Sequence, residues 1–138
     1  MSIKQTFSAG YSEKPLFQKL GIREGFRIIA INPPAGYMNI LPEHVISAKA
    51  LKGSFDLIHF FIREEKQLIS QFPHLKMHLN PSGSLWISWP KKSSSFKTAL
   101  DENEIRSIGL KNGLVDVKVC AVNDIWSGLK FVLRLKDR

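Results

Sequence analysis

The sequence contains only one cysteine, Cys120, so no disulfide can form within the chain. It also has no uninterrupted apolar stretch near the ~20 residues that a membrane-spanning helix needs, because its longest apolar runs are only strand-sized. The first ten residues lack the apolar core of a secretory signal peptide. Together these absences predict a soluble, cytoplasmic protein with no membrane segment.

Several motifs that identify common enzymes are also missing. There is no glycine-rich phosphate loop, no Gly-x-Ser-x-Gly elbow and no His-Glu-x-x-His motif. His74 and His78 have the spacing of two ligands on one helix, but no third ligand is evident, so we predict no metal site. Cys120 has no base beside it and is expected to fill space in a strand. The sequence therefore argues against P-loop enzymes and familiar hydrolases, and it assigns neither a reaction nor a cofactor.

The length and composition that are present indicate one globular domain. The chain has 138 residues, of which 43% are hydrophobic and 23% charged, so we expect a single domain over residues 1–138 with residues 1–10 flexible. Twenty Lys and Arg against twelve Asp and Glu give a formal net charge of +8 and a pI near 9.8. This balance favours an anionic partner.

Helix and strand patterns alternate along most of the chain. A short helix beginning near Pro15 is followed by expected strands at 27–32, 44–48, 55–62 and 85–89. The helical segment 64–79 contains Pro73, which predicts either a kink or two short helices.

Sequence patterns also predict the remaining connections and the elements at the end of the chain. The segment 80–83 has the composition of a turn, and 91–99 is the longest loop. Asp101 and Glu104 have capping spacing for a last helix that ends at Gly113. Strands at 114–122 and 129–136 should then form an antiparallel hairpin with one wet face.

This order of elements predicts a single α/β domain of Rossmann-like, three-layer architecture. Its sheet of about six strands should be mostly parallel and end in the antiparallel hairpin. If the chain returns past its first strand to its third, ligands should bind beyond the carboxyl ends of those two strands. The candidate ligand-binding residues at that rim, with Pro34 and Asn123 beside them, are Asn32, Pro33, Gly36, Arg63, Trp89, Lys91, Lys92, Asp124 and Trp126.

Two groups of these candidates have distinct chemistry. Trp89 could stack on a base or another aromatic ligand while Lys91 and Lys92 meet its phosphate or carboxylate, although a buried indole and a solvated loop would give the same pattern. Asn32, Arg63 and Asp124 are the side chains to test first for acid, base or oxyanion roles.

Long motifs in the chain resemble a known family. LWISWPKK and GLVDVKVCAVNDIWSGLKFV, with KPLFQKLGIREG and FDLIHFF, are similar to a family of small bacterial proteins classified as a domain of unknown function. This resemblance extends from about residue 11 to residue 134, and it implies no particular activity.

A second resemblance is to the fold of S-adenosylmethionine-dependent methyltransferases. It rests on FDLIHFF as the fourth strand of that fold, on LKMHLNPSGSLWIS in place of its Leu-Lys-Pro-Gly-Gly-x-Leu turn, and on the final hairpin. It implies a reduced methyltransferase-like topology. The chain departs from the family at NPPAG (32–36), where an acidic residue and a Gly-x-Gly loop are expected, and at Lys49, where a ribose-binding carboxylate is expected.

Three functions remain open from the sequence. The leading one is a small Rossmann-like protein that binds an anionic small molecule or nucleotide-like ligand, with no chemistry required. The second is a basic module that contacts nucleic acid or a partner protein, since residues 66–100 contain five lysines and no acid. The third is a degenerate or divergent methyltransferase. The wet face of the hairpin also suggests a homo-oligomer.

Overall fold

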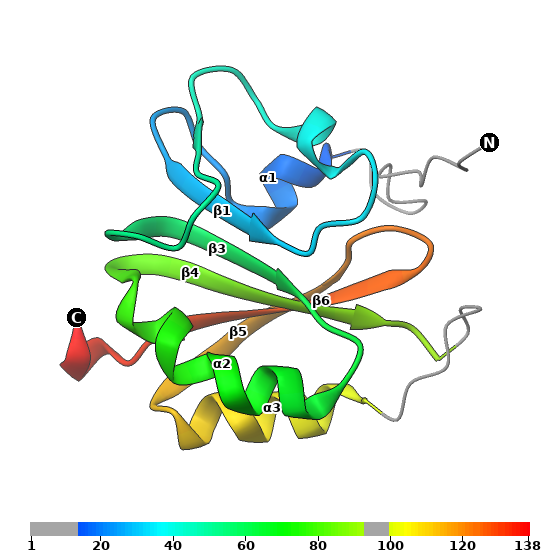
Figure 1. Ribbon diagram of the computed structural model, residues 1–138, viewed down its shortest axis with the longest axis vertical. Coiled ribbons are helices and arrows are strands. Elements are labelled where there is room, and N and C mark those ends of the chain that lie inside the picture. The colour runs from blue at the N-terminus through cyan, green and yellow to red at the C-terminus, as the bar shows by residue number, and fades with distance from the viewer. Residues whose placement is uncertain (1–13, 93–99) are drawn as a thin grey trace.

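One six-stranded sheet organises the computed structural model, which describes residues 14–92 and 100–138. In spatial order the strands are β2 (Ile46–Ser47), β1 (Arg27–Ile31), β3 (Phe55–Phe61), β4 (Leu79–Pro90), β6 (Trp126–Leu133) and β5 (Leu114–Ala121). The first four are parallel, whereas β6 is antiparallel to both β4 and β5. This arrangement confirms the predicted α/β fold and its final hairpin (Figure 1). Residues 1–10, which were predicted to be flexible, lie outside the described residues. Most of the predicted loop at 91–99 lies outside them as well.

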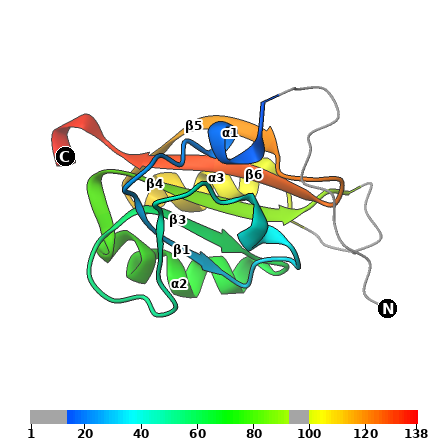
Figure 2. The same cartoon turned by 90° about the horizontal axis from the view of Figure 1, so that it is seen from above.

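Helices cover the two faces of the sheet unequally, as Figures 1 and 2 show. On one face, α2 (Glu65–Met77) and α3 (Glu102–Lys111) lie side by side. The other face is covered by α1 (Leu16–Leu20) and the 3-10 turn η1 (Tyr37–Ile40), and a last 3-10 turn, η2 (Leu135–Asp137), precedes the C-terminus. None of the helices in these described ranges is long and apolar enough to span a membrane.

Helix α2 passes through Pro73 without being divided, so the alternative of two short helices is wrong. Proline removes the amide that would bond to the Ile69 carbonyl one turn earlier. Both residues lie on the exposed side of α2, where water can bond to that carbonyl. The buried side, made of Leu68, Phe72 and Leu75, therefore continues unbroken.

Strand β4 includes the segment 80–83, which was expected to be a turn that precedes the strand. The register of β4 against β3 shifts between Phe55 and Leu57, so this prediction is wrong as a strand boundary, and the turn-like residues form an irregularity inside the strand. Gly83 is needed there because a Cβ would lie 2.9 Å from the Phe55 carbonyl oxygen.

The hairpin turn is shorter than predicted, because β6 begins at Trp126 rather than at Leu129. The side-chain oxygen of Asn123 accepts the amides of Ile125 (2.9 Å) and Trp126 (2.8 Å), which closes the turn before residue 126. The edge strand β5 is exposed on both faces rather than on one, since Lys118 is exposed and Val119, on the opposite face, is 47% exposed.

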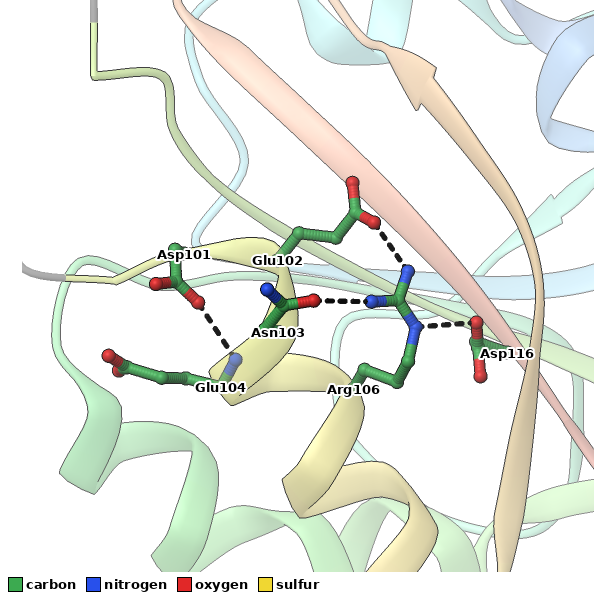
Figure 3. A network of polar contacts seen from close by, with 6 residues as sticks. All are labelled: Asp101, Glu102, Asn103, Glu104, Arg106 and Asp116. Atoms are coloured by element: carbon green, nitrogen blue, oxygen red, sulfur yellow. Dashed lines mark hydrogen bonds and ion pairs between the residues drawn. The ribbon is translucent and has the colours of Figure 1, made fainter.

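A polar network joins α3 to β5 (Figure 3). Asp101 caps the helix, as predicted, by accepting the Glu104 amide at 2.9 Å. Arg106 donates to Asp116 at 2.7 Å, and this bond holds the pKa of Asp116 below its usual range. Arg106 also donates to Glu102. Asp116 therefore holds the edge strand to the helix.

Candidate functional site

The topological switch point lies between β1 and β3, as predicted, since the chain leaves β1 for β2 and returns to the other side of β1. Two cavities open at the carboxyl ends of these strands and share Asn32 and Gln67. We call the larger one, of about 470 Å³, the switch-point cavity. Its lining residues are Asn32, Pro33, Pro34, Ala35, Phe61, Arg63, Gln67 and Trp126. The smaller cavity, of about 310 Å³, extends towards α2.

The loop after β1 forms one wall of the switch-point cavity. Asn32 has a positive φ of 57°, a conformation that asparagine tolerates better than most residues. Pro33 and Pro34 follow and have no amide hydrogen to offer a ligand. Gly36, at φ 87°, then begins η1, but it is not among the lining residues. This wall therefore presents side chains more than backbone donors to the cavity.

Arg63 and Trp126 come from separate strand ends and meet at the opposite wall. The guanidinium carbon of Arg63 lies 5.9 Å from the centre of the Trp126 ring, within the range of a cation–π contact. Trp126 is 4% exposed and packs edge-to-face on Phe61, with ring centres 5.2 Å apart. These contacts place the Arg63 guanidinium beside the Trp126 and Phe61 rings in the lining of the switch-point cavity.

Gln67 also lines both cavities, and the sequence analysis missed it. Its side-chain oxygen accepts hydrogen bonds from the backbone amides of Arg63 (2.9 Å) and Glu64 (3.0 Å). Gln67 therefore caps the start of α2 and holds the Arg63 backbone in place. The signal that could have found it is the three-residue spacing of Glu64 and Gln67 directly after a buried strand.

A buried polar chain lies behind Phe61. The Tyr37 hydroxyl is 2.8 Å from Nδ1 of His59, and Nε2 of His59 is 2.7 Å from the Ser88 hydroxyl oxygen. The His59 ring stacks on Phe61, with ring centres 4.2 Å apart. Burial lowers the pKa of His59 to about 3 and raises that of the Tyr37 hydroxyl, so both groups are neutral at pH 7. All three side chains are buried and line neither cavity, so this polar chain supports the cavity wall through Phe61.

The other predicted rim residues are distributed differently. Trp89 is 5% exposed and packs in the core beneath α2 and α3, which matches the buried-indole alternative. Lys91 is half-buried and its amide donates to the Ile125 carbonyl at 2.7 Å, whereas Lys92 and Asp124 are exposed. None of these four residues lines either cavity.

Possible metal ligands do not gather in the described part of the chain. The rings of His74 and His78 lie 5.2 Å apart at the end of α2, but no group of three or more His, Cys, Asp or Glu side chains in residues 14–92 and 100–138 could hold an ion. His78 instead bonds through Nδ1 to the Gly53 carbonyl at 2.6 Å. Burial raises the pKa of the Cys120 thiol, which is the opposite of what an activated nucleophile needs.

Comparisons with known proteins identify the fold. No protein-family model and no curated protein matches the sequence. A SAM-dependent methyltransferase from Aquifex aeolicus is similar over 84% of this chain and 86% of its own, with a TM-score of 0.63 and 13% identity. A ribosomal protein L11 methylase from Lactobacillus delbrueckii subsp. bulgaricus gives a TM-score of 0.59 over 86% and 75% of the two chains at 15% identity. A methyltransferase from Pyrococcus furiosus gives a TM-score of 0.55 over 84% of this chain and 78% of its own, at 16% identity. The chain therefore has a methyltransferase-like fold, in agreement with the second resemblance.

Proposed function

We propose that this protein binds an anionic, nucleotide-like small molecule in the switch-point cavity. The supporting observation is the lining: one guanidinium, two side-chain amides, two aromatic rings and two prolines, with no acidic residue among the described residues that form it. A volume of about 470 Å³ lies within the usual range for small-molecule sites. The position at the switch point is where open α/β sheets commonly bind ligands.

The lining assigns a role to each side chain. Arg63 meets the anionic group of the ligand, because its planar guanidinium can donate two parallel hydrogen bonds to a phosphate or carboxylate. The amides of Asn32 and Gln67 supply the polar contacts between the two walls. Phe61, Trp126 and the prolines give apolar contact to a ring. Binding requires no reaction, so the cavity can serve a sensor or carrier as well as an enzyme.

S-adenosylmethionine is the group that the fold similarity suggests, and these residues do not fit it. The described lining offers no carboxylate for the ribose hydroxyls, and Lys49 lies exposed just after β2. The prolines remove two amide donors from the loop after β1. We therefore infer a methyltransferase-like fold whose original cofactor site has changed, and we assign no methyl transfer to it.

The proposal is tested by titrating the protein with AMP and, separately, with S-adenosylmethionine, while tryptophan emission and melting temperature are followed. We expect AMP to bind saturably and Arg63→Gln to weaken binding about tenfold or more, because a hydrogen bond to a charged group contributes about 1.5–3 kcal/mol. Lys66→Gln is the matched control, since Lys66 is an exposed cation nearby on α2 that lines neither cavity. Equal loss in both variants, or tighter binding of S-adenosylmethionine than of AMP, would contradict the proposal.

A further inference from the structure

A third cavity lies at the opposite, amino end of the parallel strands. It has a volume of about 380 Å³ and is bounded by the residues before β1, the start of β3, the irregular part of β4 and the middle of β6. Its lining residues are Gly21, Arg23, Phe26, Asp56, Ser82, Ser84 and Lys130. We call it the amino-end cavity, and it shares no residue with the switch-point cavity.

Positive charge is concentrated around this cavity. Lys130 is half-buried, and its ammonium group lies 3.5 Å from the position that a Cβ on Gly21 would occupy. Lys118 is close by, since its ammonium group donates to the Lys19 carbonyl at the end of α1. Burial, and then the charges of Lys118 and Arg23, lower the pKa of Lys130. The cluster is therefore one in which like charges are held together at some electrostatic cost.

The single acid among the described lining residues, Asp56, forms no ion pair with this cluster. One carboxylate oxygen of Asp56 accepts the Arg27 amide at 2.8 Å, and the other accepts the side-chain amide of Asn80 at 2.8 Å. Within the described ranges, no carboxylate forms an ion pair with Arg23, Lys118 or Lys130. Two hydroxyl groups, from Ser82 and Ser84, complete the polar lining.

We propose that the amino-end cavity binds the terminal phosphate of a small phosphorylated molecule, held by Arg23 and Lys130 with Ser82 and Ser84 as further donors. A dianion placed there would neutralise the unpaired cations and use the hydroxyl groups as donors. The cavity exceeds the size of phosphate alone, so the ligand carries a further group. A concave site favours a terminal phosphate over the phosphodiesters of a continuous strand. This site is separate from the one proposed at the switch point and does not depend on it.

The test is a thermal-shift and calorimetric titration with inorganic phosphate, at an ionic strength kept constant with sodium chloride. We expect saturable binding that Lys130→Met and Arg23→Gln each weaken about tenfold or more. Lys130→Met should fold, because it removes a half-buried charge and keeps a side chain of similar length. Matched controls are Lys136→Gln, an exposed cation outside the cavity, and Arg63→Gln, which tests the switch-point cavity alone.

A second measurement separates site binding from general attraction. The pKa of Lys130, followed by NMR of its side chain, should rise when phosphate saturates the protein, because the bound anion stabilises the ammonium form. A response that does not saturate and is equal in all variants would indicate an adventitious ion only and overturn the proposal. Tight binding of a short oligothymidylate that phosphate does not displace would overturn it in favour of a nucleic-acid surface.

Discussion

The two faces of the sheet exclude water by different means. Beneath α2 and α3, nineteen buried hydrophobic residues of the described ranges pack into one cluster. The opposite cluster has ten, under a five-residue helix and a single 3-10 turn. There the cover is held by specific polar bonds, such as the one from the Trp86 indole nitrogen to the Leu20 carbonyl at 2.9 Å. Long helices can thus cover a sheet mainly by apolar area, with polar links such as Arg106–Asp116 added at the edge strand, whereas a thin cover relies on directed hydrogen bonds.

The thin cover also explains where the proposed sites lie. Phe61 and Trp126, which line the switch-point cavity, belong to the smaller cluster. Lys130 pairs across the strands with Trp86 of the same cluster and lines the amino-end cavity. The two proposed sites therefore lie at opposite ends of the thinly covered face, one at each end. Few helical side chains fill the space there, so a ligand has room to bind.

The largest predicted change in the free energy of unfolding comes from truncating one buried leucine under each cover, and it tests the contrast between the two faces. Leu68 on α2 and Leu20 on α1 are both completely buried. We expect Leu68→Ala to lower the free energy of unfolding by about 4 kcal/mol and Leu20→Ala by about 2–3 kcal/mol, since a short helix can move into the space that is left. Urea denaturation of both variants measures the difference. If Leu20→Ala cost as much as Leu68→Ala, the thin cover would be as rigid as the thick one.

An intermediate effect tests the polar chain of the thinly covered face. The pKa of His59 is about 3 in the folded protein because of burial, and about 6.5 in the unfolded chain. Between these values only the unfolded chain takes up the proton, so the free energy of unfolding should fall by about 1.4 kcal/mol per pH unit as the pH drops below 6.5. His59→Gln should remove this slope, while His44→Gln, at an exposed position, should keep it. Denaturation at pH 7 and pH 5 measures the slopes, and an unchanged slope in His59→Gln would show that the pH dependence arises from groups other than His59, which would contradict the prediction.

Much of the well-covered face can be predicted from sequence, because its signals are local. The apolar run 55–62 and the capping residue Asp101 each specify their element without reference to distant residues. The topological switch point also follows from the order of strands and helices alone. The positions of Asn32, Arg63 and Trp126 at the carboxyl ends of the parallel strands could therefore be predicted from the sequence alone.

The errors arise where a tertiary contact overrides local composition. Asn80 and its neighbours look like a turn, but the pairing of Leu79 and Ser84 with β3 on either side of them keeps the segment within the strand. Trp89 could have faced either way, and only the register with β6 places it on the α2 side. The partners of His59 could not be found, because Tyr37 and Ser88 are 22 and 29 residues away in the chain.

The smallest effect concerns a polar link on the well-covered face, where apolar contact already holds α3. Arg106 and Asp116 are each about a quarter exposed, so we expect Asp116→Asn to cost at most about 1 kcal/mol at pH 7. Because the pKa of Asp116 is lowered in the folded state, its contribution is present above the unfolded value near 3.9 and should fade as the pH falls through the folded value. Urea denaturation from pH 7 to pH 3 measures this, with Asp137→Asn at an exposed position as the control. A cost as large as that of a buried leucine would mean that the helical face also depends on directed bonds, and the contrast between the two faces would no longer hold.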